Sequence, residues 1–400
     1  MISDNALGPA PTAAQVIMID CSGSMSGPKL IEAKLATAVA IDTLRDGVTF
    51  AVVSGTRKAT MVYPPEPRMA AATADTRKEA KAATRLLAAS GGTAIGTWLD
   101  LADQLLAGQQ VQIKHGILLT DGHNEHQTPI ELERTLERCR GHFVCDSRGV
   151  GTGWEAKPLL AIADVLLGSA GGLTEPSELA ADFQKITENA MGKAAANVSL
   201  RLWKLPNVRV RFLKQMHPRI VDLTDRGSEV DEWTVDYPTG QWGAETRDFH
   251  LCVEVPAGTA DEKPIRMAKV SVTAGDQPSE EKPVLARWTE DAALSTKINP
   301  RVAHVTGQAE LAEAIDAGLA ARAEGNVETA TAQLGRAVRL AQESGHRETL
   351  QILARVVDVD ARTGTVRLRR KMEQVDAEMA EVVSKTTVRY RHRSAEDGSR

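Results

Sequence analysis

The sequence predicts an α/β fold: a doubly wound, mostly parallel sheet, followed by a β-sandwich and a C-terminal α-helical region. Up to about residue 195, short apolar runs alternate with segments of helical periodicity, which indicates parallel strands covered by helices on both faces. From about 196 to 292, apolar and polar residues alternate with period two between turns rich in Gly, Pro and Asp, as in an antiparallel sandwich. From about 301 to 383 the helical periodicity returns.

The first region divides into alternating strands and helices. Its apolar runs predict strands at 16–20, 49–55, 114–122, 142–151 and 165–170. Apolar residues at helical spacing predict helices at 29–44, 73–89, 94–106, 129–139, 158–164 and 178–194. Residues 1–13 form an N-terminal extension, and the domain is expected to span 14–195.

The two later regions have simpler patterns. Five alternating segments predict the sandwich domain over 196–295. Amphipathic helices follow over 300–383, with Gly325 and Gly345 as expected C-caps and with residues 366–383 continuing the helices. One helix pair there resembles a tetratricopeptide-like hairpin. Residues 384–400 are basic and without apolar periodicity, so we expect a flexible tail.

Composition limits the function classes. The 400 residues carry a net charge of −5, so no strong field draws the chain to nucleic acid or an anionic membrane. The N-terminus lacks the pattern of a signal peptide, and no apolar run approaches the roughly 18 residues of a membrane span. The four cysteines fit no zinc spacing; reduced thiols are expected, with a Cys139–Cys145 disulfide as the alternative. The expected location is the cytoplasm.

Small polar residues follow two of the predicted strands. Asp20, Ser22 and Ser24 stand at i, i+2 and i+4 after one apolar run, Asp121 ends another, and Thr93 follows two glycines before a helix. Open α/β sheets bind ligands beyond the carboxyl ends of their strands, so these side chains are expected to meet there. Their oxygens are hard ligands that suit Mg²⁺ better than zinc or copper. The alternative is that the hydroxyls only cap helices and turns.

The segments DCSGS, GGT and TDG together resemble the metal-ion-dependent adhesion site of von Willebrand factor A domains. The resemblance covers about 14–195, because GPKLIEAKLA is similar to the first helix of that family and VLLGSAGGLTEPSELAADFQKI to its last strand and helix. It implies that Ser22, Ser24 and Thr93 contact the ion, while Asp20 and Asp121 bind it directly or through water. Mg²⁺ is the expected ion, with Mn²⁺ or Ca²⁺ as alternatives.

Two acids and three neutral hydroxyls give Mg²⁺ fewer negative ligands than a closed cage of carboxylates, so the ion keeps positive character and a water-filled position that a partner's Asp or Glu can take. We therefore expect a Mg²⁺-dependent protein-binding adaptor rather than an enzyme, with His123, Glu125 and Trp154 contacting the partner. The alternative is a hydrolase that uses Ser26, or the metal, with His123 or His126. A third interpretation is a scaffold in which the metal only stabilises the loops.

The whole chain is similar to bacterial cytoplasmic A-domain proteins, a group that includes those of tellurium-resistance and stress systems. This resemblance implies one of two partner types: a AAA+ ATPase, or a stress or defence system with a Ser/Thr kinase and phosphopeptide-binding proteins. The basic, hydroxyl-rich segment SKTTVRYRHR then predicts phosphorylation at Thr386 or Thr387.

Overall fold

The computed structural model describes residues 11–260, 263–275, 277–291, 298–359, 366–369 and 372–389. The chain forms two compact units, which we call unit 1 (Met1–Val198 with Thr239–Glu245) and unit 2 (Ser199–Pro238 with Thr246–Arg400). Most of the predicted N-terminal extension, residues 1–10, lies outside the described residues, as do residues 390–400 of the predicted tail.

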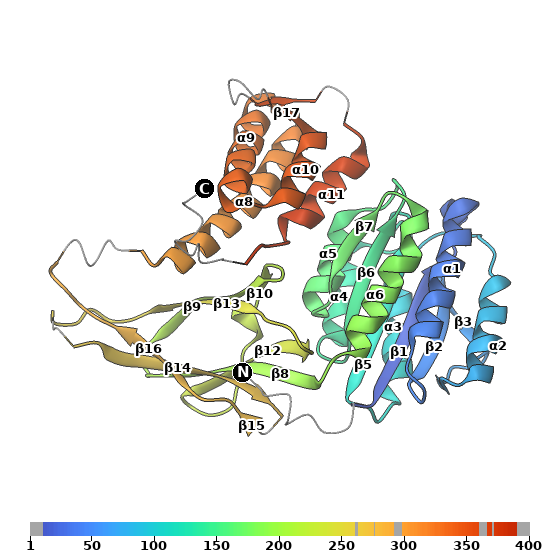
Figure 1. Ribbon diagram of the computed structural model, residues 1–400, viewed down its shortest axis with the longest axis horizontal. Coiled ribbons are helices and arrows are strands. Elements are labelled where there is room, and N and C mark those ends of the chain that lie inside the picture. The colour runs from blue at the N-terminus through green and yellow to red at the C-terminus, as the bar shows by residue number, and fades with distance from the viewer. Residues whose placement is uncertain are drawn as a thin grey trace, which may run out of the picture. The chain divides into compact units, whose positions relative to one another are not determined.

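Unit 1 is built on a mostly parallel sheet (Figure 1). Its strands are β1 Ala13–Asp20, β2 Thr49–Gly55, β3 Ala59–Tyr63, β4 Ala70–Ala71, β5 Ile113–Thr120, β6 Val144–Val150 and β7 Ala170–Leu173. The order across the sheet is β3-β2-β1-β5-β6-β7, with β4 paired to β2. Strands β3 and β4 run antiparallel to β2, and the other pairs are parallel.

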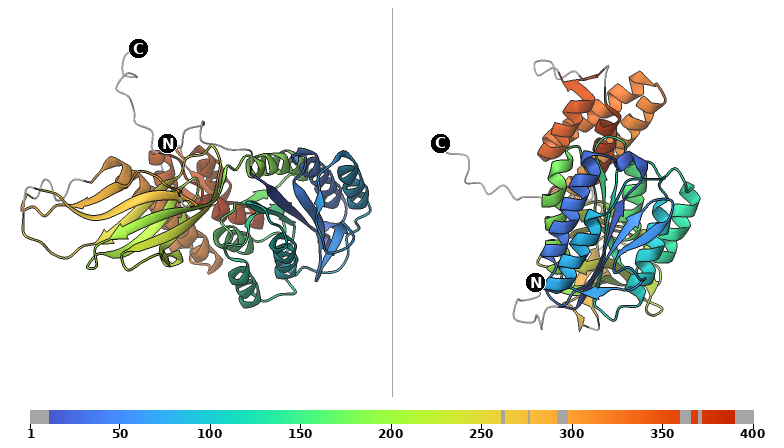
Figure 2. Two further views of the ribbon diagram at one scale, coloured as in Figure 1. Left: turned by 90° about the horizontal axis from the view of Figure 1, so that it is seen from below. Right: turned by 90° about the vertical axis from the view of Figure 1, so that its right-hand side faces the viewer.

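Helices cover both faces of this sheet, as the sequence predicts. Their bounds are α1 Pro28–Thr43, α2 Ala74–Arg85, α3 Ile95–Ala107, α4 Pro129–Cys139, α5 Ala156–Val165 and α6 Leu179–Met191. Helices α1, α2 and α6 lie on one face, and α3, α4 and α5 lie on the other (Figures 1 and 2). All eight residues of β1 are buried, which is expected of a central parallel strand with helices on both sides. Strand β1 therefore holds its last residue at a fixed point.

Two strands of unit 1 differ from the sequence prediction. The strand predicted at 165–170 is wrong, because Val165 completes α5 and the strand β7 begins only at Ala170. Between them the backbone passes so close to β6 that a Cβ on Gly168 would lie 1.9 Å from the Cys145 carbonyl oxygen. Strand β3 was not predicted, because ATMVY is a short edge strand that only continues the hairpin from β2.

A buried polar network ties β5 to β6. His115 Nε2 lies 2.8 Å from Asp146 Oδ2, and Asp146 Oδ1 accepts the N–H of Ser169 at 2.7 Å. Burial by itself would raise the pKa of Asp146, but the hydrogen bond with His115, the charges of His115 and Arg148 and the hydrogen bond from Ser169 outweigh it. The pKa of Asp146 is therefore held below its ordinary value.

We expect Asp146→Asn to lower the free energy of unfolding by about 2 kcal/mol at pH 7. Because the pKa of Asp146 is lower in the folded state, its contribution is complete above the unfolded pKa of about 3.9 and is lost as the pH falls further. Urea unfolding at pH 7 and at pH 3 should therefore show a smaller acid-induced loss in the variant than in the wild type. An equal loss in both proteins would contradict this assignment.

Strands β8 to β16 form two sheets, and β8 and β12, whose residues are divided between units 1 and 2, both belong to one of them. The strands are β8 Ala195–Lys204, β9 Arg209–His217, β10 Val221–Asp222, β11 Ser228–Glu229, β12 Thr234–Trp242, β13 Asp248–Glu254, β14 Ile265–Ala274, β15 Gln277–Pro278 and β16 Lys282–Ala286. One sheet has the order β10-β9-β13, and the other has β11-β12-β8-β14-β15 with β16 paired to β14. The antiparallel sheets predicted for this region are confirmed.

The helical part of unit 2 comprises α8 Pro300–Ala323, α9 Val327–Ser344, α10 Arg347–Val356 and α11 Gln374–Ser384. Gly325 and Gly345 adopt φ of 77° and 71° beyond α8 and α9, as their predicted role at helix ends requires. The helix predicted over 366–383 is wrong at its start, because β18 Val366–Leu368 pairs with β17 Val357–Val359 before α11 begins. Among the described residues, no helix has the length and apolarity to cross a membrane.

The first residues of the predicted flexible tail are packed. Thr386 forms a β-bridge with Arg219, and the Lys385 carbonyl accepts the N–H of Ile220 at 2.8 Å. The Thr387 side chain is buried and donates its hydroxyl to the carbonyls of Met216 and Pro218. Phosphorylation at Thr387 is therefore contradicted, because a kinase cannot reach a buried hydroxyl that is bonded to backbone. Thr386 is half-buried.

Candidate metal centre

The acids predicted to bind metal meet at the carboxyl edge of the unit 1 sheet. Asp20 is the last residue of β1, and Asp121 directly follows β5. These strands pair in parallel as far as Ile19 and Leu119. The chain passes from β1 to β2 on one side of β1 and returns as β5 on the other. The two acids therefore flank the topological switch point, where open α/β sheets bind ligands.

Asp20 is fully buried, and both of its carboxylate oxygens accept hydrogen bonds. Oδ1 accepts the N–H of Ser22 at 2.7 Å, and Oδ2 accepts the hydroxyl of Thr120 at 2.6 Å. Burial raises the pKa of Asp20 above its usual value, with a smaller contribution from the Asp121 charge, while the hydrogen bonds oppose this rise. The hydrogen bonds thus hold the carboxylate in place, but they do not offset the effect of burial on its negative charge.

The Ser22 and Ser24 hydroxyls connect to the second acid. Ser22 Oγ lies 3.0 Å from Ser24 Oγ, which donates to Asp121 Oδ1 at 2.7 Å. Lys29, from the first turn of α1, forms an ion pair with Asp121 through Oδ2, and its ammonium lies 3.5 Å from the Ser24 carbonyl. Because the Asp121 side chain is wholly buried, Lys29 supplies a positive charge that a buried carboxylate needs.

Two glycines shape the loop that carries Thr93. Gly91 has φ of 77°, a conformation that favours glycine, and its carbonyl accepts the N–H of Gly23 at 2.9 Å. A Cβ on Gly92 would lie 2.1 Å from the His126 ring, so a larger residue there would displace this side chain. The Gly-Gly pair therefore brings the Thr93 loop against the loop that follows Asp20.

Asn124 and Gln127 have a role that the sequence analysis missed. Asn124 Oδ1 accepts the N–H of Ile95 at 2.9 Å, and Gln127 Oε1 accepts the N–H of Gly96 at 2.8 Å. These bonds satisfy two free N–H groups at the start of α3 and fix the loop after Asp121 against it. The available signal was Ala94, which stands at the N-cap of α3 and has no side-chain acceptor.

The oxygens at this site fit a hard divalent cation. Neighbouring ligands of octahedral Mg²⁺, each about 2.1 Å from the ion, lie about 3.0 Å apart, which is also the distance between the Ser22 and Ser24 hydroxyls. A Cβ on Gly122 would lie 3.4 Å from Ser24 Oγ and 4.0 Å from Thr93 Oγ1, so the Thr93 hydroxyl borders the same oxygens. The residues that would hold the ion are Asp20, Ser22, Ser24, Thr93 and Asp121.

We expect Lys29→Met to raise the affinity for Mg²⁺ about tenfold, because the ammonium competes with the ion for Asp121 and repels it at short range. Isothermal titration calorimetry of the wild type and the variant measures this directly. Lys78→Met, which removes an exposed lysine of α2, is the matched control and should leave the affinity unchanged. Weaker binding by Lys29→Met would instead mean that the lysine positions Asp121 for the metal.

The residues predicted to contact a partner divide into two groups. His123 and Glu125 lie in the loop after Asp121, and the Glu125 side chain is exposed. His123 Nδ1 is paired with Glu155 Oε1 at 2.7 Å, with both side chains about two-fifths exposed. These two residues border the metal centre, and their contact with a partner stays a prediction.

Trp154, by contrast, is a core residue, and its predicted contact with a partner is wrong. Its side chain is fully buried, and Nε1 donates to the Gly151 carbonyl at 3.1 Å. The indole packs so closely on β6 that a Cβ on Gly149 would lie 2.2 Å from it. The sequence GTGWEAKP placed the residue correctly in a loop but gave no sign that the loop folds inward.

The hydrolase alternative receives no support from the geometry around Ser26. A nucleophile elbow of the G-x-S-x-G type needs serine at its middle position, and the stretch from Gly23 to Gly27 has the buried Met25 there. Ser26 Oγ donates to the Gly23 carbonyl at 2.9 Å. Burial and the adjacent Asp20 charge raise the pKa of the Cys21 thiol to about 12, so it stays protonated at neutral pH.

The four cysteines are free thiols, as expected. Among the described residues, no group of three or more His, Cys, Asp and Glu side chains could hold a metal ion. A metal centre in this part of the chain therefore depends on hydroxyl ligands.

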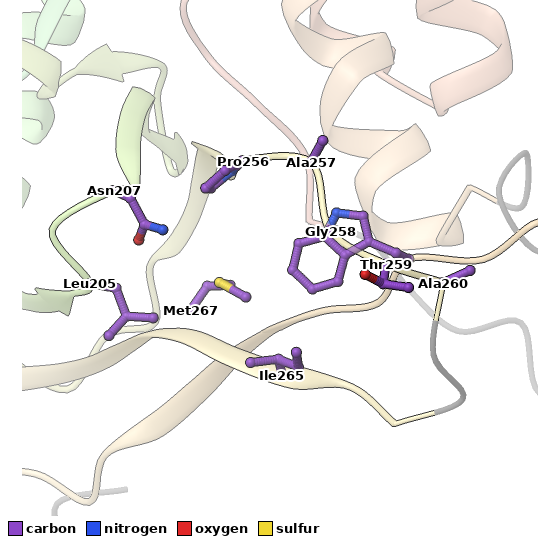
Figure 3. Close-up of a pocket in the computed structure, with 10 residues that line it drawn as sticks. Leu205, Asn207, Pro256, Ala257, Gly258, Thr259, Ala260, Ile265 and Met267 are labelled. Atoms are coloured by element: carbon purple, nitrogen blue, oxygen red, sulfur yellow. The ribbon is translucent and has the colours of Figure 1, made fainter.

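Unit 2 has a pocket of about 380 Å³ on its sandwich (Figure 3). Leu205, Ile265 and Met267 line one part of it, and Pro256 and Ala257 lie opposite. The loop that contains Pro256 and Ala257 passes so close to Trp288 that a Cβ on Gly258 would lie 2.7 Å from the indole ring. This pocket has no acid, base or thiol in its lining, so it offers no groups for metal binding or catalysis.

Comparison with known proteins identifies the fold family. The von Willebrand factor type A domain pattern matches residues 14–171, and the von Willebrand factor type A C-terminal domain pattern matches 339–384. The chain is similar to a solved structure of von Willebrand factor type A from Catenulispora acidiphila, with 46% identity and a TM-score of 0.91. That similarity covers 96% of this chain and 92% of the other.

Two further relatives are more distant. The ArnB paralog VWA2 from Sulfolobus acidocaldarius shares the fold, with a TM-score of 0.52 and 14% identity over 95% of this chain and 89% of the other. An uncharacterized protein of Synechocystis sp. is 32% identical over 219 residues, which are 52% of this chain and 49% of that protein. The chain thus spans about half the length of this curated relative. From the matched domains and the Catenulispora structure, the chain belongs to the von Willebrand factor type A family.

Proposed function

We propose that this protein is a Mg²⁺-dependent adaptor of the bacterial cytoplasm that binds an acidic residue of a partner protein at its metal centre. Domains of the von Willebrand factor type A family, some of which carry a metal-ion-dependent adhesion site, are protein-interaction modules. The observation that carries the proposal is the donor set itself: two buried acids and three hydroxyls at the switch point of the sheet.

The charge of this donor set favours an external ligand. Asp20 and Asp121 contribute two negative charges, and the Ser22, Ser24 and Thr93 hydroxyls contribute none. Mg²⁺ has six ligand positions and keeps several waters when a protein supplies few charged groups. When bound here, the ion would supply a position that a partner's carboxylate can take in place of water. Mn²⁺ and Ca²⁺ bind the same kinds of oxygen and are the alternatives.

A non-enzymatic role is part of the proposal. Hydrolysis at a metal centre needs a base positioned to activate water. Of the candidate bases, His123 is already paired with Glu155, and His126 packs its ring over Gly92. These arrangements favour a role for the two histidines at the edge of the metal centre, where they would shape the surface that a partner contacts. The adaptor role toward a AAA+ ATPase or a kinase-linked stress system follows only from the sequence resemblance, as does phosphorylation of the half-buried Thr386.

The proposal is tested by affinity capture from host lysate with the full chain as bait. Wild type in Mg²⁺, wild type in EDTA and Asp20→Asn in Mg²⁺ are compared, with Asp75→Asn as the control because Asp75 is an exposed acid of α2. Proteins retained by wild type and Asp75→Asn in Mg²⁺, and by neither of the other two samples, are the expected result. The same proteins in all four samples would show that the metal centre is not the recognition element.

A further inference from the structure

A polar cleft of about 410 Å³ lies next to the metal centre within unit 1. It lies among the tip of the β2–β3 hairpin, the first turns of α3 and the exposed side of α4. Its lining residues are Arg57, Ala94, Thr97, Asp100, His126, Gln127, Glu131, Arg134, Thr135 and Arg138. None of the three arginines is among the residues predicted from the sequence to bind a metal or a partner.

The cleft is fixed to the metal centre by backbone contacts. The Thr56 carbonyl at the hairpin tip accepts the N–H of Ala94 at 3.1 Å and Nε1 of Trp98 at 2.7 Å. Ala94 directly follows the ligand residue Thr93, whose carbonyl accepts the N–H of His126 at 3.0 Å. The cleft therefore begins one residue from a predicted metal ligand, and its position relative to that ligand is set by ordered hydrogen bonds.

The acids in the cleft are already engaged by other groups. Asp100 accepts two hydrogen bonds from Arg138 Nη2, at 2.8 and 3.1 Å. Glu131 accepts the N–H and the hydroxyl of Thr128, both at 2.8 Å, in the capping box of α4. These bonds lower the pKa of Glu131, and the nearby Arg134 charge contributes less. Both carboxylates are thus committed to structural roles.

Arg57 and Arg134 are the cationic groups that remain. Both are exposed, and neither forms an ion pair within 4 Å with any residue that the structure describes. A guanidinium presents several N–H donors in a fixed plane that matches a carboxylate. The cleft therefore offers two exposed guanidiniums that form no ion pair with the described residues, beside a centre proposed to bind a partner's carboxylate.

We propose that this cleft is a second recognition point, which receives a further Asp or Glu side chain of the same partner segment that binds the metal. The inference rests on the proposed function and specifies its partner: a segment with at least two acidic residues, one for the metal and one for Arg57 and Arg134. Charge complementarity at the rim of an interface adds modest affinity and much specificity, so the cleft would select multiply acidic segments.

The test compares two fluorescein-labelled 12-residue peptides of Gly and Ser, one with a single central Asp and one with the same Asp flanked by two Glu on each side. Fluorescence anisotropy with the full-length wild type in Mg²⁺ should show about tenfold tighter binding of the multiply acidic peptide. The double variant Arg57→Gln with Arg134→Gln should bind both peptides equally. Arg85→Gln, an exposed arginine of α2 outside the cleft, is the matched control and should retain the preference.

The outcomes separate this inference from the proposed function. Equal binding of both peptides to wild type, abolished by EDTA, would contradict the recognition of a second acid by the cleft. It would leave the proposed binding of an acid at the metal centre intact. Binding of the multiply acidic peptide that survives EDTA but is lost in the double variant would show that the two arginines bind acidic segments without the metal, and it would overturn the joint recognition proposed here. Failure of wild type to bind either peptide in Mg²⁺ would contradict both. Thermal unfolding of each variant verifies that it remains folded.

Discussion

Asp20→Asn should lower the affinity for Mg²⁺ by at least about 100-fold, since loss of groups that only support metal ligands already costs 10- to 100-fold. The variant should nevertheless fold well without metal. Asn retains an oxygen for the Ser22 N–H or the Thr120 hydroxyl. The substitution also removes the buried negative charge of Asp20, a carboxyl whose pKa is raised by burial and by the Asp121 charge. In EDTA we therefore expect the variant to be at least as stable as the wild type.

Thermal unfolding across a Mg²⁺ titration distinguishes the two effects. A ligand that binds only the folded state stabilises it by about 2.7 kcal/mol at 100 times its dissociation constant, so the wild type should gain stability with Mg²⁺ and Asp20→Asn should not. Asp75→Asn is the matched control and should behave as the wild type. An equal gain in Asp20→Asn would place the metal elsewhere, and no gain in the wild type would contradict the metal centre.

The metal centre could be predicted because its residues occupy strand ends. Asp20 and Asp121 each end an apolar run, and parallel strands bring their carboxyl ends to one edge. Lys29, in contrast, could not be predicted as a neighbour of Asp121, because its side chain reaches back from the first turn of α1 and no strand pairing places it there. The capping of α3 by Asn124 and Gln127 was missed for a similar reason, since it depends on how the loop after Asp121 folds and no periodicity reports that.

The fold was predictable where hydrophobic periodicity is strong and unclear where it is weak. Residues 16–20 could be assigned to a strand because an apolar run between polar segments has few other solutions. The strand predicted at 165–170 failed because VLL serves equally well as the end of α5. Residues 366–368 failed because a short strand needs its partner β17 to be recognised. The packed position of Thr387 depends on carbonyls some 170 residues earlier, which no local pattern reveals.

Trp154→Ala is expected to lower the free energy of unfolding by about 3–5 kcal/mol, the usual cost of removing a large buried aromatic side chain. The indole is fully buried against the backbone of β6 at Gly149, and it also donates a hydrogen bond to the Gly151 carbonyl. Its loss leaves a cavity against β6, together with a Gly151 carbonyl that loses this hydrogen bond. Urea unfolding followed by far-UV circular dichroism measures the loss, with unit 1 expected to unfold first.

Trp154→Phe provides the control for this effect, because it keeps most of the apolar volume and removes the N–H donor. Its cost should be clearly smaller than that of Trp154→Ala. Partner capture should be unchanged in Trp154→Phe, since no part of the indole reaches the surface. If Trp154→Ala instead unfolds within about 0.5 kcal/mol of the wild type, as an exposed residue would, and loses partner capture, Trp154 contacts the partner after all. Loss of capture together with loss of stability reports only the collapse of the loop that borders the metal centre.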